Sequence, residues 1–223
     1  MQMSGAPCGT TVKIPAYAIL DGGGVLGAAL AGCLKAAEDY GFEFVGYGGT
    51  SAGSIVALLA SVGYSGDELG KLITETPFTK FLEEDGKKLT ELKKHVKTII
   101  TAVQPGWIRA VLNICQLLSA FVALRSAVDD PKKAFGVDAG TSLEAFLTEM
   151  VHAKVQLLKD APMITFDQLE KAKCKPLKVI ASDLTRRQPA IFSSENQSYG
   201  LSVIDAVRAS SCYPVVFKAK VMT

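Results

Sequence analysis

The fold is decided by residues 43–62, EFVGYGGTSAGSIVALLASV, which run from a short strand-like segment through glycines into an apolar segment. Residues 43–47 predict a strand, and residues 52–62, all small or aliphatic, predict a helix that ends at Gly63. The chain therefore passes from a strand to a helix through one tight turn, and Ser51 lies in that turn.

The preceding segment repeats this arrangement. Residues 16–20 form a short apolar run that stops at Asp21 and three glycines, as a buried parallel strand does when it enters a tight turn. Residues 25–40 have helical apolar spacing, and Gly41 stands where a left-handed C-terminal cap is needed. A β-α-β-α opening of this kind predicts an α/β fold with a mostly parallel sheet.

The rest of the chain continues the α/β pattern around one different region. Capping-box sequences at Ser65–Glu68 and Thr165–Gln168 and a cap at Ser202 predict helix starts, and residues 177–181 and 190–193 predict strands. Residues 78–160 are lysine-rich, then apolar, then turn-rich, and we expect an inserted helical region or lid there. The organisation predicted is one α/β domain over residues 1–223 that contains this insertion.

Composition excludes several classes of function. The 223 residues carry a net charge of only +2, and no basic stripe interleaved with aromatics is present, so we expect no nucleic-acid partner. Five scattered cysteines without a Cys-x-x-Cys pair favour a reducing compartment, and we expect no metal site and no cofactor. The first residues do not resemble a secretory signal, so we expect a cytoplasmic protein.

The most informative motif for chemistry is Gly49-Thr-Ser51-Ala-Gly53, a G-x-S-x-G between a predicted strand and a predicted helix. In a nucleophile elbow the serine occupies a strained turn that exposes its hydroxyl, and its neighbours must be small. The following helix directs its N-terminal amides toward developing negative charge. We therefore predict that Ser51 is a nucleophile, against the alternative that the motif arose by chance in a glycine-rich chain.

A second glycine motif, Asp21-Gly-Gly-Gly-Val-Leu-Gly27, lies at the other strand-to-helix junction. Successive glycines let backbone amides converge on one anionic oxygen, which makes Gly23 and Gly24 candidates for an oxyanion hole. The spacing Gly22-x-Gly24-x-x-Gly27 also fits a dinucleotide fingerprint. That alternative requires an acidic residue at the end of the second strand, where the sequence has only glycines and Tyr47.

Together the two motifs resemble those of the patatin-like phospholipases. The segments Ala181-Ser-Asp183-Leu and Asp205-Ala-Val-Arg-Ala-Ser-Ser-Cys-Tyr-Pro214 are also similar to motifs of that family. The resemblance implies a three-layer α/β/α sandwich and lipid acyl hydrolysis of the phospholipase A type by a Ser-Asp dyad. It places the nucleophile at Ser51, the elbow glycines at Gly49 and Gly53, and the oxyanion hole at Gly22, Gly23, Gly24 and Gly27.

Two departures from the family pattern stand out. Leu26 occupies a position where the family usually has Arg or Lys, and the family's Asp-Gly-Gly or Asp-Gly-Ala motif does not occur before Thr223. We therefore expect the catalytic aspartate to lie outside residues 1–223, and this stretch alone to be inactive or nearly so. Asp183 and Asp205 are alternative bases, although the former is expected in a loop and the latter in a helix cap.

The two histidines and the inserted region complete the candidates. We expect His95 and His152 on solvated helix faces, because no acid-His-Ser arrangement follows from their positions. Lysines before the apolar stretch 107–124 suggest either a lid that binds anionic membranes or an ordinary solvated face beside a core helix. Besides a hydrolase of lipid esters, the sequence leaves open a non-catalytic lipid-binding module and a dinucleotide-binding domain.

Overall fold

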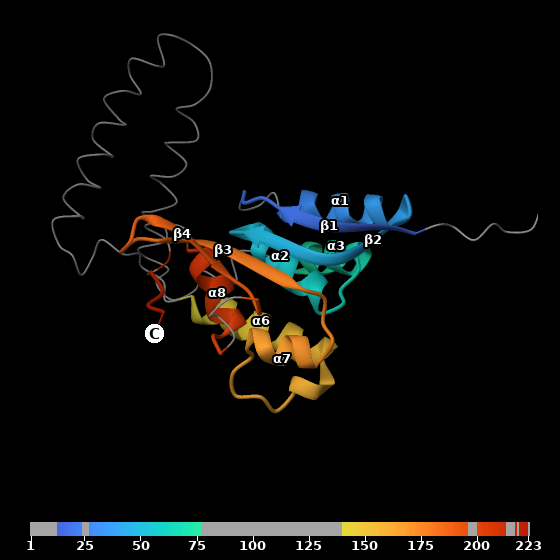
Figure 1. Ribbon diagram of the computed structural model, residues 1–223. Coiled ribbons are helices and arrows are strands. Elements are labelled where there is room, and N and C mark those ends of the chain that lie inside the picture. The colour runs from blue at the N-terminus through green and yellow to red at the C-terminus, as the bar shows by residue number, and fades with distance from the viewer. Residues whose placement is uncertain are drawn as a thin grey trace, which may run out of the picture. The chain divides into compact units, whose positions relative to one another are not determined.

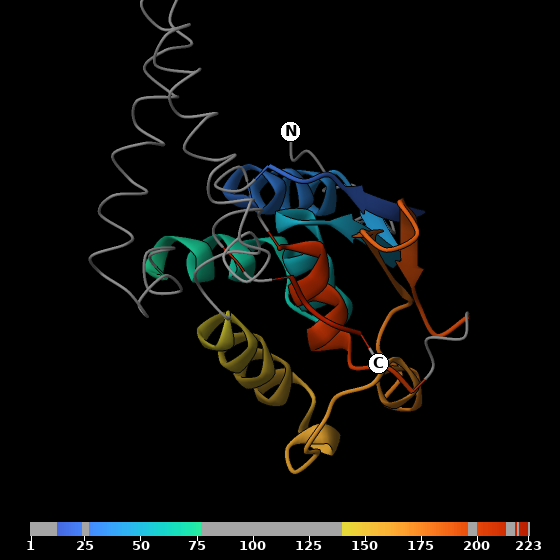
Figure 2. The same cartoon turned by 90° about the vertical axis from the view of Figure 1, so that its left-hand side faces the viewer.

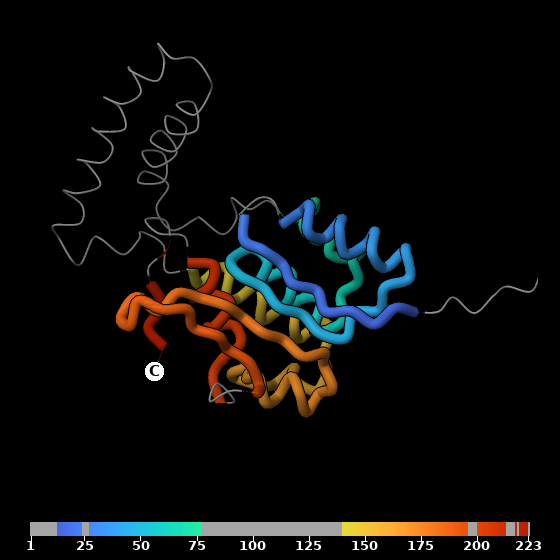
Figure 3. The backbone as a smooth tube through the Cα atoms, turned by 45° about the horizontal axis from the view of Figure 1, so that its top comes forward, coloured from blue at the N-terminus to red at the C-terminus, as the bar shows by residue number. Residues whose placement is uncertain are grey.

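Four strands form one sheet in the computed structural model, which describes residues 13–23, 27–76, 140–195, 200–212, 217 and 219–222. The order is β1 (Ile14–Leu20), β2 (Phe42–Thr50), β3 (Leu177–Asp183) and β4 (Gln188–Phe192), as Figure 1 shows. The first three strands are parallel and the last is antiparallel to its neighbour. The predicted α/β fold with a mostly parallel sheet is therefore confirmed, and the carboxyl ends of β1, β2 and β3 share one edge (Figure 3).

Strand β2 is longer than the sequence predicts, because it continues through its glycines to Thr50. Glycine normally weakens a strand interior, but here the neighbouring strand occupies the space that the side chains would fill. A Cβ on Gly46 would lie 2.8 Å from the Tyr17 ring, and one on Gly48 would lie 3.0 Å from Ile19 Cδ1. The side chains of β1 thus cover the glycines of β2, as in aromatic rescue of a sheet.

Helix α2 (Ala52–Ser61) is the central helix of the packing. It contacts β1, β2 and β3 as well as the helices α1 (Gly27–Asp39) and α8 (Val203–Ser210), and Figure 2 shows α8 beside α2. A helix that is apolar on all sides is expected to be buried, and Ala57 and Leu58 are fully inaccessible. Gly41 and Gly63, predicted to end helices, have φ angles of 99° and 108°.

Within the described residues, the remaining helices are α3 (Gly66–Glu75), α6 (Thr141–Lys154) and α7 (Phe166–Lys171), with a short 3₁₀ helix η3 (Gln156–Leu158). Both predicted capping boxes form, at Ser65 with Glu68 and at Thr165 with Gln168. Among the described residues, no helix is both long enough and apolar enough to span a bilayer.

The chain divides into two compact units. One comprises residues 1–76 and 147–211, and the other comprises residues 77–146 and 212–223. In the second unit, Lys220 Nζ lies 2.9 Å from Glu144 Oε1. Most of the expected insertion at 78–160, with its lysines and the apolar stretch 107–124, lies outside the described residues, while its last part contains all of α6 and η3.

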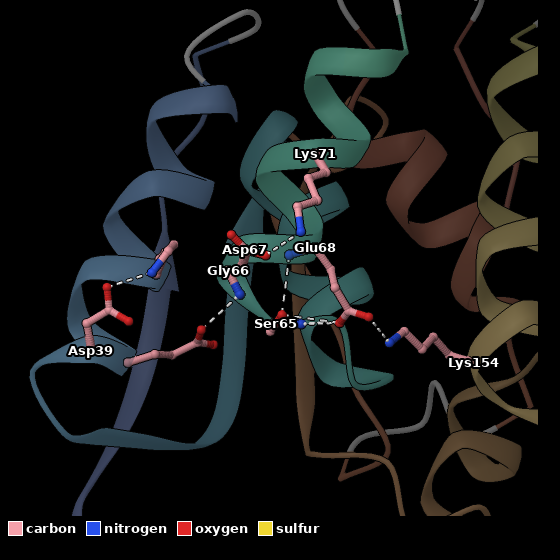
Figure 4. A network of polar contacts seen from close by, with 9 residues as sticks. Asp39, Ser65, Gly66, Asp67, Glu68, Lys71 and Lys154 are labelled. Carbon is pink, nitrogen blue, oxygen red and sulfur yellow. Dashed lines mark hydrogen bonds and ion pairs between the residues drawn. The ribbon is translucent and has the colours of Figure 1, made fainter.

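Glu68 links two helices at the start of α3 (Figure 4). Its carboxylate accepts hydrogen bonds from the Ser65 amide at 2.9 Å and from Lys154 Nζ at 2.7 Å. The bond to Lys154, followed by the bond to the Ser65 amide, lowers the pKa of Glu68 below its ordinary value. The same turn is attached to α1, because the Gly66 amide donates to Glu38 Oε2 at 2.9 Å.

These contacts predict different costs for two substitutions of Glu68. Glu68→Gln can keep the capping box but loses the ion pair, which is partly exposed, so we expect a loss of about 0.5 kcal/mol in unfolding free energy. Glu68→Ala loses both the capping box and the ion pair, and we expect the unfolding free energy to fall by about 1.5 kcal/mol. Urea unfolding at pH 7 measures the two values, and equal losses would contradict the separation of cap from ion pair.

The pH dependence of the ion pair has a definite sign. Because the pKa of Glu68 is lowered in the folded chain, its contribution is complete above the ordinary value of 4.5 and is lost as pH falls through the lowered folded value. The stability difference between the wild-type chain and Glu68→Gln should therefore shrink below pH 4.5. A difference that stays constant with acidification would show that the charge is not its cause.

Candidate active site

Ser51 lies between β2 and α2 in a strained backbone conformation, with φ 51° and ψ −126°. A side chain rarely adopts a positive φ, and such conformations cost roughly 1–3 kcal/mol unless the surroundings enforce them. The residue is only partly buried. This is the local geometry that a nucleophile elbow requires, since a sharp turn lifts the side chain off the end of the strand.

The glycines on either side of Ser51 are required by backbone contacts. A Cβ on Gly49 would lie 2.7 Å from the amide nitrogen of Ser54, in the first turn of α2. A Cβ on Gly53 would lie 2.5 Å from the carbonyl oxygen of Asp21 and would also overlap the carbonyl of Leu20. The end of β1 therefore packs directly on the first turn of α2, which brings the two sequence motifs together.

The glycine-rich turn after β1 lies against Ser51. A Cβ built on Gly22 would be 3.1 Å from Ser51 Cβ, and one on Gly27 would be 3.8 Å from Ala52 Cβ. The two turns follow Leu20 and Thr50, and Leu20 pairs with Gly49 in the parallel ladder. The parallel register thus explains why two motifs far apart in sequence become neighbours.

The four predicted oxyanion glycines have different surroundings. The Gly22 amide already donates to Asp21 Oδ1 at 2.7 Å, an interaction that holds the turn. Gly27 is the first residue of α1, and Gly24 lies outside the described residues. Close packing is therefore the role that the contacts of Gly22 support, and Gly23 and Gly24 stay the predicted donors.

Two serines that the sequence did not single out hold the backbone of Ser51. The Ser51 amide donates to Ser210 Oγ at 2.8 Å, and Ser210 Oγ donates to the carbonyl oxygen of Ile180 at 2.5 Å. The Ser51 carbonyl accepts from the Ser54 amide at 2.9 Å and from Ser54 Oγ at 2.6 Å. The available signal for Ser210 was its place in the family-like segment 205–214.

The alternative bases have local structural roles. Asp183 Oδ1 accepts from the amides of Thr185 and Arg186 at 2.9 and 3.0 Å, which closes the turn after β3. Asp205 lies in the first turn of α8, where its amide donates to Ser202 Oγ at 3.1 Å. Among the described residues, no hydrogen bond joins the Ser51 hydroxyl to a carboxylate or an imidazole.

His152 does not have the solvated position that we expected. It lies on α6, its Nε2 atom is buried, and within the described part of the chain no hydrogen-bond partner reaches that atom. A 14-residue helix packed along part of its length can bury one edge of an imidazole, and residue types alone do not reveal which edge. His95 lies outside the described residues.

Tyr47 supports the strand that carries Ser51. Its ring is buried beside Phe44, with 5.8 Å between the ring centroids. Burial, with a smaller contribution from the negative charge of Glu38, raises the pKa of Tyr47 to about 12. Because the pKa of Tyr47 is raised in the folded chain, the buried neutral phenol makes its full contribution to stability below pH 10. That contribution is lost as pH rises from 10 to about 12.

We therefore expect a destabilisation above pH 10 that depends on Tyr47. The upper limit is about 2–3 kcal/mol, from a shift of two pKa units at 1.36 kcal/mol each. The variant Tyr47→Phe should lose less stability than the wild-type chain between pH 10 and 12 in urea unfolding. Tyr40, 81% exposed, is the matched control, and equal alkaline slopes for Tyr47→Phe and Tyr40→Phe would contradict the assignment.

Comparisons with known proteins identify the family of the chain. A sequence profile described as "Patatin-like phospholipase" matches residues 18–223. The chain belongs to this family. Protein YqhO of Bacillus subtilis (strain 168) is 29% identical over 205 residues, which cover 90% of this chain and 56% of YqhO. The chain thus spans about half the length of this curated relative.

Two solved structures share the fold. VipD from Legionella pneumophila has a TM-score of 0.53 at 17% identity, over 90% of this chain and 43% of VipD. ExoU from the type III secretion system of Pseudomonas aeruginosa, in complex with SpcU, has a TM-score of 0.55 at 21% identity. That match covers 91% of this chain and 39% of the other. At these identities the likeness concerns the α/β fold of the family rather than the chemistry.

Proposed function

We propose that the protein is a lipid acyl hydrolase of the phospholipase A type, or a related carboxylic ester hydrolase, with Ser51 as its nucleophile. Membership of the patatin-like phospholipase family supports lipid hydrolysis in general. The observation that carries the proposal for these residues is the contact between two turns: Ser51, in a strained strand-to-helix turn, lies against the glycine-rich turn after β1.

The proposed reaction has two halves. Ser51 Oγ attacks the ester carbonyl while its proton passes to an aspartate. The tetrahedral intermediate then collapses, the ester C–O bond breaks, and the aspartate returns the proton to the leaving oxygen, which releases the neutral alcohol. Water then attacks the acyl-enzyme with the same aspartate as base, which releases the fatty acid and restores the Ser51 hydroxyl. The amides of Gly23 and Gly24 and the N-terminal end of α2 are proposed to stabilise the oxyanion.

The proposed base is the aspartate of the family's Asp-Gly-Gly or Asp-Gly-Ala motif, outside residues 1–223. Asp183 is a poor substitute, because its carboxylate closes the turn after β3. Asp205 is a poor substitute because it lies in the first turn of α8, where a carboxylate stabilises the positive end of the helix dipole. The proposal requires no histidine, metal or cofactor. We also propose that the protein is cytoplasmic and contacts membranes peripherally through the segment around 87–124. Co-sedimentation with anionic and neutral vesicles tests that contact.

The decisive assay compares two lengths of chain. A chain that includes the family's aspartate motif is expected to hydrolyse short-chain p-nitrophenyl esters and to release fatty acid from phospholipid vesicles, whereas residues 1–223 alone are expected to be inactive. Rapid hydrolysis by residues 1–223 that is abolished by Ser51→Ala would contradict the proposal that the catalytic base lies outside these residues. Failure of the longer, folded chain to hydrolyse any ester would contradict the proposed function.

The same site leaves one second candidate, a lipid-binding module without catalysis. It is favoured by the lack, within the described part of the chain, of any hydrogen bond from the Ser51 hydroxyl to a carboxylate or imidazole. Vesicle binding by the longer chain without fatty-acid release would support it. The dinucleotide alternative has no such support, because β2 ends in Gly48, Gly49 and Thr50 without an acidic residue.

A further inference from the structure

The hydroxyl of Ser210 occupies the place of a missing rung in the β2–β3 ladder. Tyr47 pairs with Leu177 and its amide donates to the carbonyl of Pro176 at 2.8 Å. The hydrogen-bonding period of a parallel strand is two residues, so the amide of Ser51 and the carbonyl of Ile180 are the partners two rungs further along. Those two groups are instead joined through Ser210 Oγ, which accepts from the first and donates to the second.

Insertion of a hydroxyl changes the distance between the strands at this point. A direct rung would place nitrogen and oxygen about 2.9 Å apart. Here two hydrogen bonds in series, of 2.8 and 2.5 Å, separate the Ser51 amide from the Ile180 carbonyl. The Ser210 hydroxyl therefore ends the ladder at Thr50 and lets the chain turn away from β3 at Ser51.

The backbone of Ser51 is thereby held at both ends. Ser210 holds its amide, and the amide and hydroxyl of Ser54 hold its carbonyl. A conformation with φ 51° persists only where such contacts outweigh its cost. Without the Ser210 hydroxyl, the Ser51 amide and the Ile180 carbonyl would each lose this hydrogen-bond partner. They could then bond to each other only as a direct rung of the ladder, and that bond would draw Ser51 toward β3.

We propose that Ser210 is a positioning residue, which sets the direction of the Ser51 side chain by holding the Ser51 amide away from β3. This inference rests on the hydrolysis proposed above. It also assigns the amide of Ser51 to structure rather than to the oxyanion hole, because Ser210 Oγ already accepts its hydrogen. The hydroxyl comes from the last residue of α8, 159 positions after the nucleophile, so α8 becomes part of the elbow.

The adjacent residue provides a matched control. Ser211 Oγ is buried at the end of α8, where Ser210 is partly buried, and it donates within its own helix, to the Val207 carbonyl at 2.8 Å. In the chain that carries the family's aspartate motif, Ser210→Ala is expected to lower kcat about 10- to 100-fold with KM within about twofold, as a displaced nucleophile should. Ser211→Ala should leave both constants within about twofold, although each variant loses one helix-end hydroxyl.

Two further variants separate positioning from stability. Ser210→Thr keeps the hydroxyl and is expected to retain kcat within about fivefold, while Ser210→Cys, a poor hydrogen-bonding replacement of similar size, should resemble Ser210→Ala. The rate of Ser51 labelling by a fluorophosphonate should be close to that of the wild-type chain in Ser210→Thr and lower in Ser210→Cys and Ser210→Ala. If Ser210→Ala does not fold, the threonine and cysteine variants carry the test.

The outcomes distinguish this inference from the function on which it rests. Wild-type kcat in folded Ser210→Ala or Ser210→Cys, alongside loss of hydrolysis in Ser51→Ala, would overturn positioning and leave the proposed function standing. Hydrolysis that survives Ser51→Ala would overturn both. Equal loss of kcat in the Ser210→Ala and Ser211→Ala variants would also overturn positioning, since it would reflect damage to α8 in general.

Discussion

Ser51→Ala is expected to abolish ester hydrolysis in the chain that carries the family's aspartate motif, with kcat falling by roughly 10³-fold or more. The reason is chemical, because no acyl-enzyme can form without the hydroxyl. Labelling by a fluorophosphonate should disappear in parallel. Ser61→Ala is the control on the same helix, since Ser61 Oγ is buried and donates only to the Leu58 carbonyl at 2.7 Å. Hydrolysis that persists in Ser51→Ala would refute Ser51 as the nucleophile.

The same position should separate activity from stability. Alanine at 51 inherits the unfavourable φ of 51°, whereas glycine adopts positive φ without a steric cost. We expect Ser51→Gly to be as inactive as Ser51→Ala but more stable than it, by about 1 kcal/mol in urea unfolding. A glycine variant less stable than the alanine variant would show that the elbow conformation is not strained.

Gly53→Ala is expected to produce the largest loss of stability, roughly 3 kcal/mol or more, or to prevent folding. Its Cβ would overlap the carbonyl of Leu20 and lie 2.5 Å from that of Asp21, and a backbone cannot move aside as a flexible side chain can. The overlap would separate β1 from α2, and with them the glycine-rich turn from Ser51. Any variant that folds should therefore also lose activity.

Two helical glycines are matched controls for this prediction. Gly32 in α1 and Gly70 in α3 have nothing within 4 Å of an added Cβ. Alanine there is expected to raise stability by about 0.5–1 kcal/mol, because it lowers the backbone entropy lost on folding. Helix propensity alone predicts stabilisation at all three positions. A tolerated Gly53→Ala would contradict the close packing of β1 on α2.

The predictions for Ser51 and Gly53 depend on the same close packing around the turn between β2 and α2. Gly49 and Gly53 are small because backbone occupies the space of their side chains, and Gly22 is small because Ser51 does. The residues that let the sheet and α2 approach each other are thus the ones that place the nucleophile beside the glycine-rich turn. Substitutions at these glycines should therefore damage fold and activity together, whereas Ser51→Gly should damage activity alone.

The sequence by itself determined the elements and the junctions between them. Apolar runs, helical spacing and the caps at Ser65, Thr165 and Ser202 act within a few residues, so they can be read without knowledge of the rest of the chain. The strand-to-helix position of Ser51 could be predicted for the same reason, and so could the glycine caps at Gly41 and Gly63.

Only the tertiary structure decided which distant groups meet. The extension of β2 through its glycines depends on the side chains of β1, and the burial of His152 Nε2 depends on the packing of α6. The hydrogen bond from the Ser51 amide to Ser210 Oγ joins residues 159 positions apart. A serine hydroxyl can bond almost any nearby polar group, so its residue type carries no information about its partner, which is selected only when β2, β3 and α8 come together.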